Sequence, residues 1–233
     1  MILSDIKSAP ATAPIDAVLL SRNETEALCL KAARGAGMSW GLAEEAAFAA
    51  GWLGAHGIDG AGALLRHLDA VGAAKFDQLR PWPQPGYWRA ASDGVLCPIC
   101  LGSALLDHAG LADGPFAAPV QTDAASQPVL LAPFLAEAGA RLGGAISLSC
   151  AGLALSLGAG QPDTQALAAL AGIATAPVRL APSAFAPCPS MPMQPAAVST
   201  ATIATLEAYA LRITVPATEA SRRGAGAGSN DND

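Results

Sequence analysis

The chain has 233 residues, a formal net charge of −6 and only 13 lysine or arginine residues, which form no polybasic stretch. Because phosphate backbones and anionic membrane surfaces are bound by clustered cations, this charge argues against nucleic acid or a membrane as a partner. Hydrophobic residues, many of them alanine, make up 52% of the chain and charged residues 14%, which excludes a disordered composition and predicts a globular protein with a sizeable core.

The N-terminal residues and the cysteines give an expectation about compartment. Residues 1–14 include Asp5 where an export signal would be apolar, and the five cysteines are an odd number. We therefore expect no export signal, reduced thiols and a cytoplasmic location. Residues 1–17 are expected to form a flexible extension before the first ordered segment.

The capping residues and glycines of the next segment predict three helices. Ser21 and Glu24 match the S-x-x-E capping box, in which each side chain accepts a hydrogen bond from the backbone amide of the other residue. Ser39 is a similar N-cap candidate, and glycines mark the helix ends. On this basis helices are expected over residues 21–35, 39–57 and 61–71, with Gly35 and Gly57 as the terminating glycines.

The remainder of the chain predicts mainly strands and turns. Residues 80–88 (RPWPQPGYW) are broken by prolines and cannot be helical. After them, apolar runs that alternate or are uninterrupted predict strands over residues 95–99, 128–135, 145–152, 153–158 and 174–181. Helical patterns return over residues 103–108 and 199–213.

These elements predict an α+β fold, with three N-terminal helices packed on a mixed β-sheet, a late helix and a Gly-rich C-terminal tail. We expect a single domain over residues 18–220, with a helical part over 18–80 and a strand-rich part over 90–216. The tail is expected over residues 221–233.

An uncharged stretch over residues 142–160 has about the length of a membrane-spanning helix. Glycine and serine recur through it, and its serines alternate with apolar neighbours. Two buried strands joined by a glycine turn account for this pattern better than a membrane span does.

The stretch GIDGAG, residues 57–62, lies between the second and third predicted helices. It resembles the G-x-D-S-H-G segment of the malate/L-lactate/ureidoglycolate dehydrogenase family, whose N-terminal helices the chain also resembles. The resemblance implies a helical architecture shared with NAD(P)-dependent enzymes and a histidine acid/base at position 61. Here Gly60 and Ala61 stand at the serine and histidine positions. Because a methyl group exchanges no proton, we expect no acid–base catalysis at this place.

A second resemblance extends over more of the chain. Residues 22–53 (RNETEALCLKAARGAGMSWGLAEEAAFAAGWL) and 213–233 (ITVPATEASRRGAGAGSNDND) resemble the opening and closing segments of a bacterial family, domain of unknown function 3726. This resemblance implies a family relationship over residues 18–233. It implies no reaction and no cofactor.

Cys97 and Cys100 form a C-P-I-C motif, and three interpretations stay open. The pair is a redox dithiol candidate, because helix N-termini lower the pKa of thiols. It is also half of a zinc site, although the four-ligand set would have to be completed from Cys29, Cys150, Cys188 and His108. The third interpretation is a pair of small buried hydrophobic side chains, and we expect no metal site.

The C-terminal tail is a candidate anion site, because alternating glycines let backbone amides converge on an anion and arginines pair with it. The candidate ligand-binding residues are Arg34, Ser221, Arg222, Gly224, Gly226 and Gly228. Arg34 has an alternative role, the neutralisation of a helix C-terminus. The alternatives for the tail are a solvated linker-like segment or a cation site at Asp231 and Asp233.

We expect a non-catalytic accessory or interaction protein that binds a protein partner or a second copy of itself. The alternative is a small-molecule metabolic enzyme that binds an anionic metabolite near the C-terminal tail. The sequence assigns neither a cofactor nor a catalytic residue.

Overall fold

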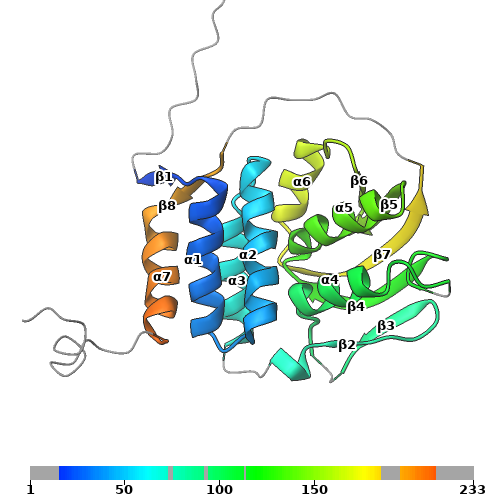
Figure 1. The fold of residues 1–233 in the computed structure, drawn as a ribbon, viewed down its shortest axis with the longest axis horizontal. Helices are drawn as coiled ribbons and strands as arrows, with labels where there is room; N and C mark the ends of the chain where they lie inside the picture. Colours follow the sequence, from blue (N-terminus) through cyan, green and yellow to red (C-terminus); the bar gives the residue numbers. More distant parts are fainter. Residues whose placement is uncertain (1–15, 73–75, 92–93, 113, 185–194, 214–233) are drawn as a thin grey trace, which may run out of the picture.

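Figure 1 shows the computed structural model, which describes residues 16–72, 76–91, 94–112, 114–184 and 195–213. Helices and strands both occur along most of this part of the chain. The predicted α+β class, with helices and a mixed sheet, is confirmed.

The N-terminal helices and the late helix form one helical layer. The layer consists of α1 (Arg22–Gly35), α2 (Trp40–Ala55), α3 (Gly60–Val71) and α7 (Thr200–Leu211). Helix α1 packs on both α2 and α7, and α3 packs on α2 and α7. A two-stranded antiparallel sheet of β1 (Ala17–Leu19) and β8 (Ala197–Ser199) precedes α1 and α7 at their N-terminal ends.

Side-chain caps explain where these helices begin. The backbone amide of Ser21 donates to Glu24 Oε2 at 2.8 Å, and Ser21 Oγ accepts from the amide of Glu24 at 3.3 Å. Ser39 Oγ accepts from the amide of Leu42. The predicted N-caps are therefore confirmed. Helix α1 ends at Gly35 as predicted, but Gly35 is its last helical residue, and the left-handed position after the helix belongs to Gly37, with φ 100°.

The second layer is a six-stranded sheet in the order β2-β3-β4-β7-β5-β6. Strands β3 and β4 are parallel and the other neighbours are antiparallel, so the sheet is mixed. Its strands are β2 (Pro81–Trp82), β3 (Tyr87–Ala90), β4 (Val120–Ser126), β5 (Ala145–Cys150), β6 (Leu153–Gly158) and β7 (Thr175–Ser183).

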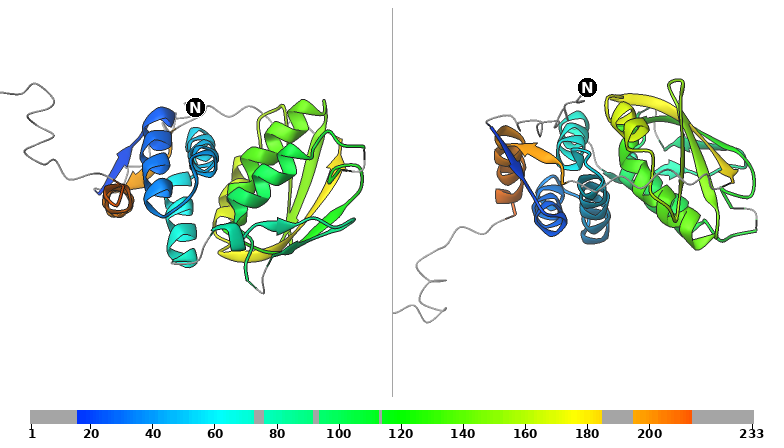
Figure 2. Two further views of the ribbon diagram at one scale, coloured as in Figure 1. Left: turned by 60° about the horizontal axis from the view of Figure 1, so that its bottom comes forward. Right: turned by 90° about the horizontal axis from the view of Figure 1, so that it is seen from above.

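Helices of the strand-rich part cover one face of this sheet (Figure 2). They are α4 (Pro98–Asp107), α5 (Ala132–Arg141) and the short α6 (Thr164–Ala171), with the 3₁₀ helix η2 (Pro128–Leu131) leading into α5. Helices α4 and α5 also pack on α2, and so they join the helical layer to the sheet. The described helices leave the opposite, outer face of the sheet uncovered in Figure 2.

Buried and partly exposed side chains alternate along the strands, so the sheet has one buried face and one exposed face. Leu148, Leu155 and Leu180 are buried, whereas Ser147 and Ser149 are partly exposed. Burial of the leucine face against α5 therefore fixes which way each strand faces.

The uncharged stretch over residues 142–160 forms two strands, as predicted. Strands β5 and β6 pair over their full length, and the turn residues Ala151 and Gly152 have φ values of 48° and 82°. Two consecutive positive φ angles match the twist of a tight β-hairpin. No helix of the described ranges has the length and apolar character needed to cross a membrane.

Two strand predictions are wrong. Residues 128–135 form η2 and the start of α5, and residues 95–99 run through an isolated bridge at Leu96 into α4. Short uninterrupted apolar runs fit a buried helix as well as a buried strand, and a proline near the start of α4 and of α5 fits the first turn of a helix. The sequence interpretation also missed several short elements, namely β1, β2, β3, β4, β8, α6 and the 3₁₀ helix η1 (Phe76–Gln78).

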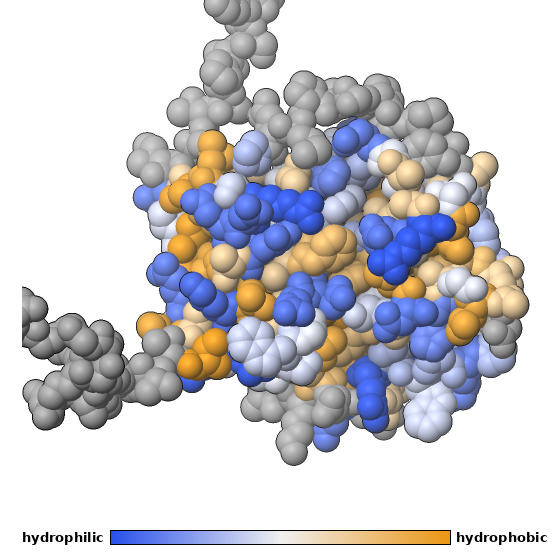
Figure 3. Space-filling view, in the orientation of Figure 1, coloured by the Kyte–Doolittle hydropathy of each residue, from blue (hydrophilic) through white to orange (hydrophobic). Residues whose placement is uncertain are grey.

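The surface over α1, α2, α4 and α5 carries hydrophilic and hydrophobic side chains interspersed (Figure 3). Exposed ion pairs join Arg22 to Glu26 on α1 and Arg141 to Glu137 on α5, each pair one helical turn apart. Such pairs contribute little to stability. The helical layer therefore depends on its buried alanine and leucine contacts.

Candidate functional site

The segment GIDGAG forms the close crossing of α2 and α3. A Cβ built on Gly60 would lie 2.9 Å from both the Cα and the carbonyl carbon of Ala50, and closer still to the carbonyl oxygen. Asp59 caps α3, since its Oδ1 accepts from the amide of Gly62 at 2.8 Å. Ala61 is 0% exposed. These residues therefore build a tight helix contact, and Ala61 offers neither a titratable group nor an exposed surface.

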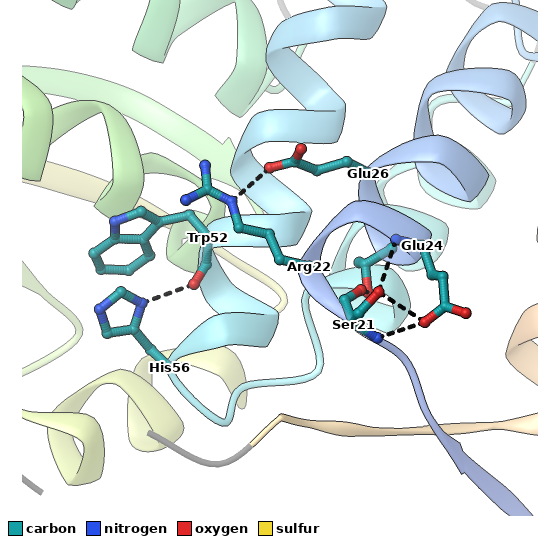
Figure 4. Close-up of polar contacts among 7 residues, drawn as sticks. Ser21, Arg22, Glu24, Glu26, Trp52 and His56 are labelled. Atoms are coloured by element: carbon teal, nitrogen blue, oxygen red, sulfur yellow. Dashed lines mark hydrogen bonds and ion pairs between the residues drawn. The ribbon is translucent and has the colours of Figure 1, made fainter. Parts of the chain in front are cut away.

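His56 lies at the C-terminal end of α2, where its ring stacks on Trp52 with 3.9 Å between centroids (Figure 4). His56 Nδ1 lies 2.7 Å from the carbonyl oxygen of Trp52. Burial lowers the pKa of His56. The nearby Arg22 pairs with Glu26 at 2.7 Å. His56 is thus engaged by its own helix end and does not replace the histidine that position 61 lacks.

Arg34 is held by its local surroundings. Its Nη1 donates to the carbonyl oxygen of Met38, and its guanidinium lies 4.8 Å from the centroid of the Trp40 ring. Arg34 Nε is buried and has no hydrogen-bond partner among the described residues. The other predicted ligand-binding residues fall outside the described ranges, as do the alternative cation ligands; these residues are Ser221, Arg222, Gly224, Gly226, Gly228, Asp231 and Asp233.

Cys97 and Cys100 do come together. Cys97 is the N-cap of α4 and Cys100 is three residues later, so both side chains lie on the first turn of the helix. Their thiols are hydrogen-bonded to each other. Cys100 Sγ also points to the carbonyl oxygen of Phe76, at 4.0 Å.

His67 completes this thiol cluster, which we define as His67, Cys97 and Cys100. His67 Nε2 lies 3.2 Å from Cys97 Sγ, and His67 and Cys97 are both 0% exposed. Helix α3 supplies the histidine and the first turn of α4 supplies the thiols. The sequence carries no signal for this contact, because the two residues are 30 positions apart in the chain.

Burial sets the protonation of the thiol cluster. Desolvation raises the pKa of Cys97 well above its ordinary value and the contact with Cys100 adds to this, while the amides of Cys100 and Ile99 act in the opposite direction. Burial lowers the pKa of His67 to about 4. Because each neutral form is favoured, the cluster holds a neutral thiol beside a neutral imidazole at neutral pH.

One nitrogen of His67 is left unsatisfied. Nδ1 is buried and has no hydrogen-bond partner among the described residues, which costs about 1–3 kcal/mol in an apolar surrounding. His67 lines a hollow of about 190 Å³, whose polar wall also includes Ser126 and Thr175. Four apolar residues form the rest of its lining.

The residues that could have completed a zinc site with the C-P-I-C motif are scattered. Cys29 is buried in α1 and Cys150 in β5, while His108 Nδ1 lies 2.8 Å from the carbonyl oxygen of Ala104. Cys188 lies outside the described residues. Across the described ranges, no group of three or more His, Cys, Asp or Glu residues is arranged to hold a metal ion.

A larger hollow, of about 730 Å³, lies beside β3 and β4. Its acidic group is Asp123, which accepts from Tyr87 Oη at 2.7 Å and from the amide of Ala90 at 2.8 Å. These hydrogen bonds, with that from the amide first, lower the pKa of Asp123. Both carboxylate oxygens are thus used to tie β3 to β4, and this hollow contributes no candidate acid or base from Asp123.

A family model described as protein of unknown function (DUF3726) matches residues 20–95 of the chain. The match covers the opening segment of the predicted family resemblance, and the closing segment, residues 213–233, lies beyond it. No curated protein matches the sequence.

Among solved structures, malate dehydrogenase from Pyrococcus horikoshii OT3 is similar to the chain, with a TM-score of 0.41 and 14% sequence identity. The similarity covers 60% of this chain and 42% of that one, so the chain spans less than half the length of the dehydrogenase. The resemblance to the DUF3726 family is therefore confirmed over residues 20–95.

Proposed function

We propose that the protein is a non-catalytic accessory or interaction protein whose N-terminal helices are dehydrogenase-like. The observation that carries this proposal is the packing of Gly60 and Ala61 at the crossing of α2 and α3. Hydride transfer to a carbonyl needs a group that supplies a proton within hydrogen-bond reach. At the place where the resemblance implies that group, this chain has a buried methyl and a close backbone contact.

The two histidines nearest in sequence do not supply the missing group. His56 is stacked on Trp52 at the end of α2, and His67 faces Cys97 in the buried thiol cluster. Catalytic geometry tolerates a misplacement of only about 1 Å. Because both histidines are held by other contacts, they support a role for the helical layer that does not include acid–base catalysis.

The uncovered outer face of the sheet supports an interaction role. Short, uncharged side chains lie on this face of β5 and β6, namely Ser147, Ser149, Ala154 and Ser156; β7 adds Ala181 opposite Ser147 and the exposed Arg179 opposite Ser149. The short side chains of Ser147 and its strand partners Ser156 and Ala181 leave a flat patch beside Arg179 that another protein backbone can approach closely. We propose this face as the contact for a protein partner or for a second copy of the chain.

Steady-state turnover tests the proposal most simply. The purified full chain is incubated with NAD(P)+ and a panel of 2-hydroxy acids, and with NAD(P)H and the matching 2-oxo acids. We expect no nicotinamide-dependent turnover above the rate without protein. Sustained turnover by the wild-type chain contradicts the proposal.

Sedimentation velocity tests the proposed surface for association between copies. We expect Ser147→Arg to abolish association, because a long charged side chain among short ones keeps the two surfaces apart, and we expect Ala201→Arg to leave association intact. Ala201 is exposed on α7, away from the six-stranded sheet. Association that is equally strong in both variants excludes the outer face as the contact.

The second candidate is a small-molecule enzyme, and one observation favours it. Cys97 Sγ lies 3.2 Å from His67 Nε2, which is the pairing of nucleophile and base found in thiol catalysis. In this candidate, Arg222 and the glycines of the tail bind an anionic metabolite. Binding of small carboxylates to the full chain, measured by calorimetry, should be lost in Arg222→Ala. Equal binding by the wild type and the variant refutes the anion site.

A further inference from the structure

The first turn of α4 holds two thiols three residues apart. Cys97 occupies the N-cap position and Cys100 the third helical position, where the side chains of a capping box face each other across the start of a helix. The thiols already contact each other through a hydrogen bond. A covalent bond between the two sulfur atoms therefore joins groups that are neighbours before any reaction.

The thiol cluster also contains a base, His67, and lies beside a small hollow. His67 Nε2 lies 3.2 Å from Cys97 Sγ. The other ring nitrogen, Nδ1, is buried without a hydrogen-bond partner among the described residues, and His67 lines a hollow of about 190 Å³. The His67 side chain thus lies between Cys97 and a hollow that has Ser126 and Thr175 on its polar wall, and neither cysteine lines this hollow.

We propose that Cys97 and Cys100 are a dithiol that a small hydroperoxide oxidises to an intramolecular disulfide, with His67 as the proton acceptor. Because Cys97 is fully buried and does not line the hollow, only an oxidant small enough to pass His67 reaches its sulfur. Hydrogen peroxide fits such a space, whereas a bulky disulfide such as glutathione disulfide does not reach the Cys97 sulfur. This inference is independent of whether the chain binds a partner or turns over a metabolite.

The reaction has two balanced steps. In the first, His67 Nε2 takes the Cys97 proton while the sulfur attacks one peroxide oxygen. The O–O bond breaks, Cys97 becomes a sulfenic acid, and the leaving hydroxide takes the proton from His67 as water. In the second, the Cys100 sulfur attacks the Cys97 sulfur, the S–O bond breaks, and the departing hydroxide leaves as water with the Cys100 proton. Two thiols lose two electrons and one hydrogen peroxide is reduced to two waters.

The environment explains why a base is needed. Burial holds the Cys97 thiol in its protonated, weakly nucleophilic form, and burial also leaves His67 unprotonated but makes it a weaker proton acceptor than an exposed histidine. Oxidation is therefore expected to be slower than that of an exposed low-pKa thiol. Removal of the imidazole should slow it further.

The experiment uses the full chain with Cys188→Ser, which removes the one cysteine outside the described residues. The protein is treated with hydrogen peroxide or with glutathione disulfide, and its intact mass and peptide map are followed over time. With hydrogen peroxide we expect the loss of two hydrogens and a Cys97–Cys100 cross-link. With glutathione disulfide we expect little reaction. The proposal is overturned if hydrogen peroxide gives no such cross-link or if glutathione disulfide forms it as fast.

Three variants test the roles within the cluster. In Cys100→Ser we expect oxidation to stop at a Cys97 sulfenic acid, which dimedone traps. In His67→Gln we expect oxidation about tenfold slower or more. Cys150→Ser, a buried thiol in β5, is the matched control and should react at the wild-type rate. An unchanged rate in a folded His67→Gln refutes the role of the base. If circular dichroism shows that this variant is unfolded, the comparison of the two oxidants decides alone.

Discussion

Replacement of Gly60 by alanine is the sharpest test of the helix crossing. Gly60 is the first residue of α3, and a Cβ there would lie 2.9 Å from two backbone atoms of Ala50. Real Cβ atoms essentially never come within 3.0 Å of another atom, and a helix backbone cannot rotate away as a flexible side chain can. Gly60→Ala must therefore push α3 away from α2.

The magnitude follows from two opposing contributions. Alanine in place of glycine favours a helix by at most about 1 kcal/mol, and less at a helix end. Overpacking of a close contact costs about 1–3 kcal/mol, with backbone atoms at the upper end of this range. We therefore expect Gly60→Ala to lower the free energy of unfolding by about 2 kcal/mol.

Gly41→Ala is the matched control, since Gly41 lies in the first turn of α2 and has no atom within 4 Å of a Cβ built on it. There we expect a small gain in stability, of about 0.5 kcal/mol. Urea unfolding followed by circular dichroism measures both changes. The packing account is refuted if Gly60→Ala is as stable as the wild type, or if the two glycine variants change stability in the same direction.

Three further predictions concern other parts of the helical layer and the thiol cluster. The ordinary pKa of histidine is 6.5 and that of buried His67 is about 4, so the unfolded chain binds the proton more tightly. The free energy of unfolding should therefore fall by about 3 kcal/mol as the pH falls from 6.5 to 4, and urea titrations should show a smaller fall in His67→Gln. Ser21→Ala removes the capping box and should cost about 1 kcal/mol in the same assay. Gly35→Ala should destabilise by about 2 kcal/mol and expose α7 to proteolysis, because the new Cβ clashes with the Tyr209 carbonyl; protection as in the wild type would contradict this.

The sequence was informative where a local rule decides the structure. Ser21 with Glu24, and Ser39, carry their own hydrogen-bonding partners within a turn, so the starts of α1 and α2 follow from a few adjacent residues. The hairpin of β5 and β6 follows from alternating serines and leucines with a glycine in the turn. These signals need no knowledge of the rest of the chain.

The sequence-based predictions failed where contacts between residues far apart in the chain determine the structure. Residues 128–135 are an uninterrupted apolar run, and only their position between the sheet and α2 makes them helical. Strand β4 has a polar sequence, VQTDAAS, and is held in the sheet by its neighbours β3 and β7. Gly60 looked like part of a loop, although its role is a contact with the Ala50 backbone that no local pattern reveals.

The candidate site was predictable only in part for the same reason. Cys97 and Cys100 share a helical turn, but the strand predicted over residues 95–99 would have placed them on opposite faces, so their proximity did not follow from the sequence interpretation. His67 joins them from another helix, 30 positions away, through the fold. The predicted ligand-binding role of Arg34 stays a prediction, since its observed contacts are with Met38 and Trp40.

The most direct test of the central claim is to put a histidine at position 61. If GIDGAG is a helix crossing, Ala61→His overfills a position that is 0% exposed, so the variant should be less stable than the wild type and should not turn over NAD(P)H with 2-oxo acids. If the segment is instead a catalytic loop that has only lost its side chain, the variant should gain nicotinamide-dependent turnover. Turnover by a folded Ala61→His protein would contradict the account.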